Sequence, residues 1–147
     1  MTETRVRPRR AKERRGMHVS RRARVLLAED DDEMRYLLAG ALLKQGHDVV
    51  PMPNGLQLLE EVATSERRGD PVDVVITDVR MPGVTGLEAL EWLRELGCRA
   101  PLLVITAFGD EPTHAEARRL GATAVLDKPF DMEVLTRLVE EVLACPE

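Results

Sequence analysis

Short apolar runs alternate with longer amphipathic segments along the chain. Five runs that are rich in Val, Leu and Ile occupy residues 24–28, 48–52, 74–76, 101–105 and 122–126. Such runs are typical of strands that are buried on both faces. The pattern therefore predicts five short strands, of which the central one stops at Asp78.

The segments between and after these runs carry apolar residues at helical spacing. They predict one helix after every strand, although the helix at 111–120 is weakly marked and 67–71 is a polar break. We expect Trp92 to lie in the core and His114 to be exposed and structural. The predicted helix-core positions are Met34, Leu37, Leu38, Ala41, Leu42, Leu56, Leu59, Val62, Ala63, Leu87, Leu90, Leu93, Leu96, Leu135, Leu138, Val139 and Val142.

The regular alternation of strand and helix sets the fold class. Five βα units in succession favour an α/β fold with a mainly parallel sheet and helices on both of its faces. A length of 147 residues is enough for one domain with a substantial core.

Composition excludes several classes of protein. No apolar run is long enough to cross a bilayer, and no apolar segment follows the basic N-terminus as in a secretory signal. Cys98 and Cys145 match no metal-ligand spacing. A reduced, cytoplasmic location is the expectation that follows.

Charge divides the chain into two parts. Residues 1–24 hold ten Lys and Arg against two Glu, whereas the remainder is strongly acidic. We interpret residues 1–22 as a basic, disordered arm and residues 23–147 as the folded domain. The arm could bind DNA or another acidic partner, it could be a solvated tail, or translation could begin at Met17. Removal of residues 1–16 is expected to leave folding intact.

Polar side chains stand at the ends of four of the five strands. Glu29 and Asp30 follow the first strand, Asp78 the third, Thr106 the fourth and Lys128 the fifth. In a parallel sheet these ends share one edge, which is where open α/β sheets bind ligands. The sequence therefore predicts three carboxylates, a hydroxyl and an ammonium group at one rim.

This set of groups suits phosphoryl chemistry. Carboxylates gathered in one place repel each other unless a cation lies among them, and Mg²⁺ prefers oxygen ligands. Asp78 could then act as a nucleophile towards phosphorus, with Lys128 and Thr106 contacting the phosphoryl oxygens. Helix capping or a turn would account for some of the acids, and a surface charge for the lysine.

Other phosphate sites fit less well. The sequence has no GxxxxGK[ST] loop and no GxGxxG after the first strand, where a flavin-phosphate loop would also need amide donors in place of acids. A phosphatase of the haloacid dehalogenase type would have a second Asp two positions after its nucleophile, where this chain has Arg80.

Four stretches in order, VLLAEDDDEMR, VVITDVRMPGVTGLEAL, LLVITAFGD and LGATAVLDKPF, resemble the receiver domain of bacterial two-component response regulators. The resemblance covers roughly residues 24–144. It implies a flavodoxin-like (βα)5 three-layer sandwich with a parallel sheet in the order 2-1-3-4-5. It also implies a sensor histidine kinase or a histidine phosphotransfer protein as a partner, and a chain that catalyses its own phosphorylation and dephosphorylation.

The resemblance assigns roles to the residues at the rim. Asp78 would be the phosphoacceptor, Thr106 the switch hydroxyl, and Lys128 the family's lysine, with Lys128-Pro129 as a cis peptide. The residues implied to hold Mg²⁺ are Glu29, Asp30, Asp78 and the backbone carbonyl of Arg80.

Two departures from the family pattern concern output. Val125 stands where the family often has Tyr or Phe, and in this sequence we expect only Cys145, Pro146 and Glu147 after the last helix, with no output domain. The main hypothesis is a stand-alone receiver that binds a downstream protein. The alternatives are the receiver portion of a DNA-binding or enzymatic regulator, and a binding module that works without phosphate. Arg80 and Phe108 flank the expected phosphoryl site and are expected to tune dephosphorylation.

Overall fold

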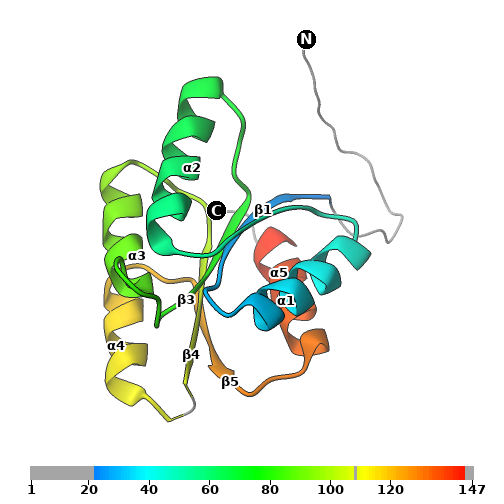
Figure 1. The fold of residues 1–147 in the computed structure, drawn as a ribbon, viewed down its shortest axis with the longest axis vertical. Helices are drawn as coiled ribbons and strands as arrows, with labels where there is room; N and C mark the ends of the chain where they lie inside the picture. Colours follow the sequence, from blue (N-terminus) through cyan, green and yellow to red (C-terminus); the bar gives the residue numbers. More distant parts are fainter. Residues whose placement is uncertain (1–21, 108, 145–147) are drawn as a thin grey trace.

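The structure, a computed structural model, describes residues 22–107 and 109–144 (Figure 1). Residues 1–21 of the proposed arm, Phe108 and Cys145 lie outside the described residues. The predicted alternation of strand and helix is confirmed. In chain order the elements are β1 Arg24–Ala28, α1 Asp32–Lys44, β2 Asp48–Met52, α2 Gly55–Arg68, β3 Val74–Asp78, α3 Gly86–Glu95, β4 Leu102–Ala107, α4 Glu111–Arg119, β5 Ala124–Lys128 and α5 Met132–Ala144.

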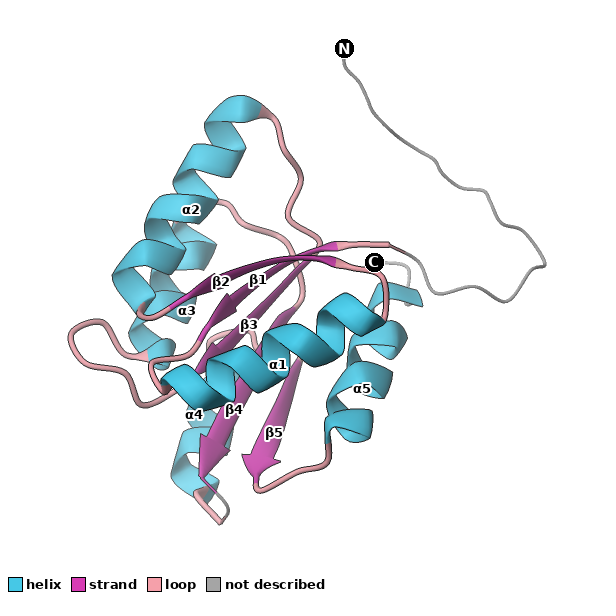
Figure 2. Cartoon of the chain, turned by 45° about the vertical axis from the view of Figure 1, so that its right-hand side comes forward, coloured by secondary structure: helices cyan, strands magenta, loops and turns pink. Residues whose placement is uncertain are grey.

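The five strands form one parallel sheet in the order β2-β1-β3-β4-β5. Helices α1 and α5 cover one face, while α2, α3 and α4 cover the other (Figure 2). This arrangement is the predicted flavodoxin-like three-layer sandwich. Because all strands are parallel, their carboxyl ends meet at one edge of the sheet.

Alternation of side chains along the strands builds two separate cores. Leu26, Val75 and Val104 face the α2–α3–α4 layer, while Leu27 and Ile76 face the α1–α5 layer. All five residues of β3 are buried, including the polar Thr77 and Asp78. The central strand therefore carries Asp78 into a protected position at the sheet edge.

Strands and helices differ from their expected bounds at a few points. Strands β4 and β5 extend to Ala107 and Lys128. Thr106 and Lys128 are therefore among the last residues of their strands and do not lie beyond them. Helix α2 runs to Arg68, into the segment that we expected to be a polar break, and ends at Gly69, whose φ is 75°. The extended β5 keeps Lys128 in register with Ala107 of β4.

Five predictions of burial were wrong. Three leucines that we expected in the core are exposed, namely Leu37 at 48%, Leu56 at 56% and Leu96 at 47%. Trp92 is 58% exposed, and His114 is only 9% exposed. In α3 the buried residues Ala89, Leu90 and Leu93 form the inward face, and Trp92 lies beside that face rather than on it. His114 is buried because its imidazole has a hydrogen-bonding partner in β5, which offsets the cost of removing it from water.

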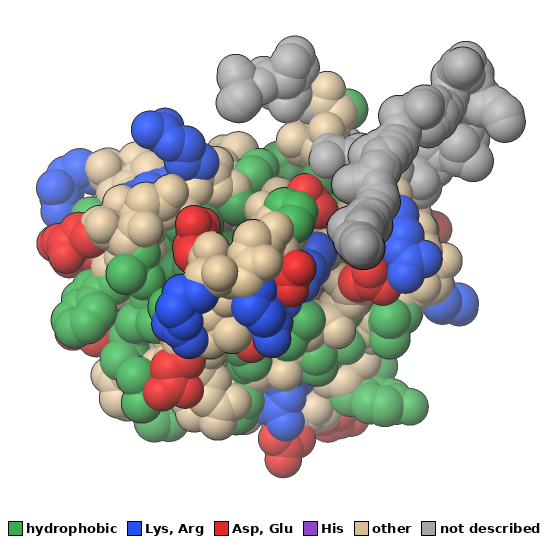
Figure 3. Space-filling view, turned by 90° about the horizontal axis from the view of Figure 1, so that it is seen from above, with side chains coloured by type: hydrophobic (Ala, Val, Ile, Leu, Met, Phe, Trp, Pro, Cys, Tyr) green, Lys and Arg blue, Asp and Glu red, His purple; other side chains and the backbone are tan. Residues whose placement is uncertain are grey.

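The amino end of the sheet, seen from above in Figure 3, carries basic and acidic side chains interspersed. Three ion pairs involve residues in or next to the amino ends of β1, β2 and β3 or the end of α2: Arg22 with Asp48, Arg24 with Glu61, and Arg68 with Asp70. Among the described helices, none combines the length and the apolar character that crossing a bilayer requires.

Candidate functional site

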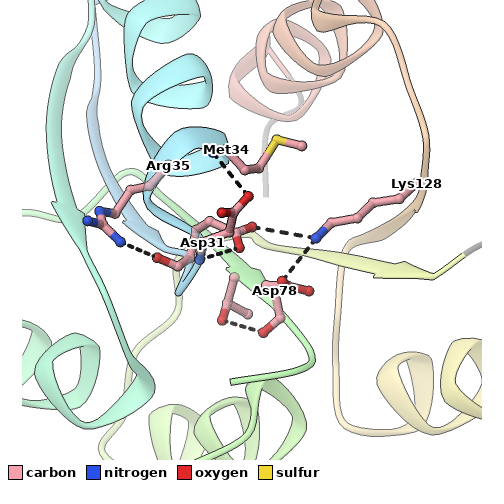
Figure 4. Close-up of polar contacts among 7 residues, drawn as sticks. Asp31, Met34, Arg35, Asp78 and Lys128 are labelled. Atoms are coloured by element: carbon pink, nitrogen blue, oxygen red, sulfur yellow. Dashed lines mark hydrogen bonds and ion pairs between the residues drawn. The ribbon is translucent and has the colours of Figure 1, made fainter. Parts of the chain in front are cut away.

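The polar residues predicted to share one rim do so. Glu29 directly follows β1, Asp78 ends β3, Thr106 lies near the end of β4 and Lys128 ends β5. Figure 4 shows the side chain of Lys128 extending from its strand towards Asp78. The sheet topology brings together residues that are up to about a hundred positions apart in the chain.

Lys128 is shared between two buried carboxylates. Its Nζ donates a hydrogen bond to Asp78 Oδ2 at 3.1 Å and lies 3.7 Å from Glu29 Oε1. Partial burial lowers the pKa of Lys128, but the hydrogen bond and charge of Asp78, with the charges of Glu29 and Asp30, outweigh it and raise that pKa above its ordinary value. The lysine is therefore held as a cation beside the carboxylate of Asp78.

Glu29, Asp30 and Asp78 form a compact acidic group. Each offers one carboxylate oxygen, and these oxygens all lie within 4.8 Å of one another. Glu29 and Asp78 are buried, at 1% and 5% exposure, whereas Asp30 is exposed. Burial raises the pKa of the Glu29 carboxyl to about 7; the hydrogen bond from the Asp31 amide opposes this, and the charge of Asp78 adds to it.

The donor set fits a hard divalent cation. Glu29 Oε2 accepts a hydrogen bond from the Asp31 amide at 3.1 Å, whereas Oε1 has no hydrogen-bond partner within the described part of the chain. A buried carboxylate oxygen without a donor is costly. With two further carboxylates nearby and one of them open to solvent, the group offers the oxygen-only ligands that Mg²⁺ prefers.

The β1–α1 loop positions Glu29 through its own hydrogen bonds. Asp31 caps α1 by accepting a hydrogen bond from the Met34 amide at 3.3 Å. Arg35 donates to the backbone oxygen of Glu29 at 2.8 Å (Figure 4). It also donates to Asp32 at 2.6 Å. We did not identify Arg35 from the sequence, where only its i,i+3 spacing from Asp32 was visible.

The β3–α3 loop is packed tightly under Asp78. A Cβ on Gly86 would overlap the backbone oxygen of Asp78 and lie 2.8 Å from the Cα of Val79. The Gly86 amide donates to the Val79 oxygen at 2.9 Å. Thr85 and Glu88 then start α3 with a capping box. Glycine at position 86 therefore lets the loop return close enough to hold the end of β3.

The remaining predicted residues lie around this centre. Thr106 is 1% exposed, and its Oγ1 has no hydrogen-bond partner among the residues described. Arg80 has a side chain that is 76% exposed, with its guanidinium 3.9 Å from Asp110 Oδ2. The Lys128-Pro129 peptide is cis, as the resemblance implied.

A second polar contact beside the rim was not expected. His114 Nε2 and Asp127 Oδ1 are 2.6 Å apart, and this pair joins α4 to β5 directly before Lys128. Helical periodicity alone gave no signal for it, because the partner lies on another element.

Comparisons with known proteins agree on one family. The family model for the response regulator receiver domain matches residues 25–140. Regulatory protein AtoC of Escherichia coli is 34% identical over 120 residues, which cover 82% of this chain and 25% of AtoC. Sporulation initiation phosphotransferase F of Bacillus subtilis is 30% identical over 120 residues, which cover 82% of this chain and 93% of that protein.

Solved structures of this fold superpose closely on the chain. A crystal structure described as FixJ-N has a TM-score of 0.75 at 29% identity, covering 86% of this chain and 98% of that one. The chemotaxis response regulator CheY4 of Vibrio cholerae has a TM-score of 0.72 at 29% identity, covering 84% and 100%. The chain spans about a quarter of the length of AtoC and of the NtrC regulators that it also matches.

Proposed function

The chain belongs to the family of response regulator receiver domains, and on that basis we propose that Asp78 is its phosphoacceptor. The observation that carries this proposal is the environment of Asp78: a buried carboxylate at a strand end, with Lys128 Nζ at 3.1 Å and two more carboxylates beside it. Carboxylates that repel each other lower the stability of the folded state. A role in phosphoryl transfer would explain why the site nevertheless contains them.

The proposed reaction is transfer from a phosphohistidine. A carboxylate oxygen of Asp78 forms a bond to phosphorus while the bond from phosphorus to the histidine nitrogen breaks, and its electron pair stays on that nitrogen. Lys128 stabilises the negative charge that collects on the phosphoryl oxygens. Thr106 supplies a hydroxyl, which lacks a partner among the described residues and can donate to such an oxygen.

A magnesium ion is the proposed cofactor. Its ligands would be Glu29, Asp30, Asp78 and the backbone carbonyl of Arg80. Oε1 of Glu29, which accepts no hydrogen bond from the described residues, supports the first of these. When bound, the ion supplies positive charge that offsets the charges of the carboxylates and the phosphoryl oxygens. The protein residues themselves hold the acceptor carboxylate, the lysine and the hydroxyl in place.

We propose a sensor histidine kinase or a histidine phosphotransfer protein as the donor, and a downstream protein as the target of the phosphorylated form. The proposed organisation remains a basic arm at 1–22 and a receiver domain at 23–147. Both reactions, phosphorylation and dephosphorylation, would be catalysed by the receiver, in the cytoplasm.

DNA binding is a second candidate for the whole protein. NtrC of Escherichia coli, which is 32% identical over 120 residues, is described as a DNA-binding transcriptional regulator. The ten Lys and Arg residues within positions 1–24 would also suit a phosphate backbone. A salt-dependent affinity for duplex DNA that disappears when residues 1–24 are deleted would support the arm as the contact. Equal affinity without the arm would contradict it.

The site assignment can be tested by trapping the modified residue. The chain is incubated with acetyl phosphate and Mg²⁺ and then with borohydride, which reduces an aspartyl phosphate to homoserine. Peptide sequencing by mass spectrometry should find homoserine at position 78. Homoserine at another Asp, with none at 78, would contradict the assignment.

A further inference from the structure

Helix α4 is attached to the sheet by few residues. Of its nine residues only His114 and Ala117 are buried, compared with five in α2 and four in α3. Ala117 has a small side chain and buries little apolar area. A polar contact therefore makes up an unusually large share of what holds α4 to the sheet.

That contact is short and shielded. His114 Nε2 lies 2.6 Å from Asp127 Oδ1, and the two side chains are 11% and 33% exposed. A hydrogen bond between partly buried polar groups is strengthened by the lower local dielectric, and breaking it leaves both groups poorly solvated. The pair therefore fixes the position of α4 relative to β5.

Asp127 lies at the same edge of the sheet as the proposed phosphoacceptor, Asp78. It pairs in register with Thr106 of β4, and the next pair along the strands is Ala107 with Lys128. Side chains of paired residues in neighbouring strands project from the same face of a sheet. Asp127 therefore projects from the same face as Thr106, and His114 reaches the sheet at that point.

We propose that the His114–Asp127 hydrogen bond couples the position of helix α4 to the phosphorylation state of Asp78. The inference rests on the function proposed above. A phosphoryl group adds negative charge and acceptor oxygens next to Lys128 and Thr106. Both residues flank Asp127, one along β5 and one across the β4–β5 ladder, so a rearrangement of either shifts the group to which His114 is bonded.

Val125 does not provide an alternative contact of this kind. It lies two residues before Asp127 on the same face of β5, where it packs as a partly buried residue against the apolar core. Its side chain has no polar atom and is smaller than an aromatic ring. Among the described residues, the polar pair is the side-chain hydrogen bond that connects the carboxyl end of β5 to α4.

Amide hydrogen exchange of the full chain tests the coupling. Exchange of peptides from residues 111–119 is measured with and without excess acetyl phosphate and Mg²⁺, and intact mass gives the phosphorylated fraction of the same samples. In the wild type, phosphorylation should change exchange in α4. His114→Leu should abolish that change while phosphoryl uptake persists, and His114→Gln, which keeps an N–H donor, should restore it.

A matched variant on the same helix controls for lost stability. Glu116→Gln removes the charge of the exposed ion pair between Glu116 and Arg119 and should leave the response of α4 intact. An unaltered response in His114→Leu would overturn the coupling, as would a phosphorylated wild type in which α4 exchange does not change. Absence of any phosphoryl adduct on Asp78 would instead refute the proposed function, and the coupling with it.

Discussion

Lys128 Nζ lies 3.1 Å from Asp78 Oδ2, although the two residues are fifty positions apart and their strands, β5 and β3, are separated by β4. The lysine side chain therefore extends past the end of β4 to reach the carboxylate. This relationship accounts for the electrostatics of the site, since one ammonium group offsets part of the charge of two buried acids.

Replacing Lys128 with Met should slow phosphorylation. The charge that collects on the phosphoryl oxygens would lose its ammonium partner, and loss of one such group typically costs about 100-fold in rate. The measurement is the rate of adduct formation with acetyl phosphate and Mg²⁺. Lys44→Met, in the last turn of α1, is the control and should react at the wild-type rate. A wild-type rate in Lys128→Met would contradict the role of the lysine.

Replacing Glu29 with Gln should stabilise the metal-free chain at alkaline pH. Burial first, and then the charge of Asp78, raise the folded-state pKa of Glu29 to about 7. The folded state therefore binds a proton more tightly than the unfolded state, and stability is lost as pH rises from about 4.5 towards 7. Gln avoids this loss and should gain up to about 3 kcal/mol at pH 8.

The measurement for Glu29→Gln is urea unfolding with EDTA between pH 4 and 8. The difference from wild type should vanish towards the acid end, where the wild-type carboxyl is protonated in both states. A variant that is less stable than wild type at pH 8 in EDTA would show that burial of the ionised Glu29 carboxylate does not destabilise the folded chain.

Magnesium should stabilise the folded chain through the acidic group. A ligand at a hundred times its dissociation constant adds about 2.7 kcal/mol to stability. Asp30→Asn removes the exposed carboxylate of the group and should reduce the rise in melting temperature on adding Mg²⁺. Asp70→Asn, which removes the carboxylate paired with Arg68, should keep the full rise. An equal rise in both variants would exclude Asp30 as a ligand.

Gly86→Ala should destabilise the chain because a Cβ would overlap the backbone of Asp78. Overpacking of this kind typically costs about 1–3 kcal/mol. Gly40→Ala is the matched control: Gly40 is an exposed position inside α1 with no atom within 4 Å of the added Cβ. It should gain about 0.5–1 kcal/mol. Urea unfolding measures both, and equal effects would contradict the close packing under Asp78.

The sequence predicted the strands and the rim because both leave a local pattern. Each strand is a short apolar run, and four of the five are followed or ended by a polar residue. Once the strands are parallel, Glu29, Asp78 and Lys128 must meet at one edge. The prediction needed no knowledge of side-chain contacts.

The residues that the sequence did not predict depend on contacts between distant elements. His114 was expected at the surface because its partner Asp127 lies thirteen residues away on a strand. Arg35 reaches a backbone oxygen, which leaves no trace in residue patterns. Trp92 was assigned to the core from its size and neighbours, but the orientation of α3 leaves it 58% exposed.

The most direct test of the central claim is intact mass after incubation with acetyl phosphate, with and without Mg²⁺. Wild type and Asp70→Asn should each gain the mass of one phosphoryl group in the presence of the metal, and Asp78→Asn should gain none. An Asp78→Asn chain that still takes up the phosphoryl group at the wild-type level would contradict the account.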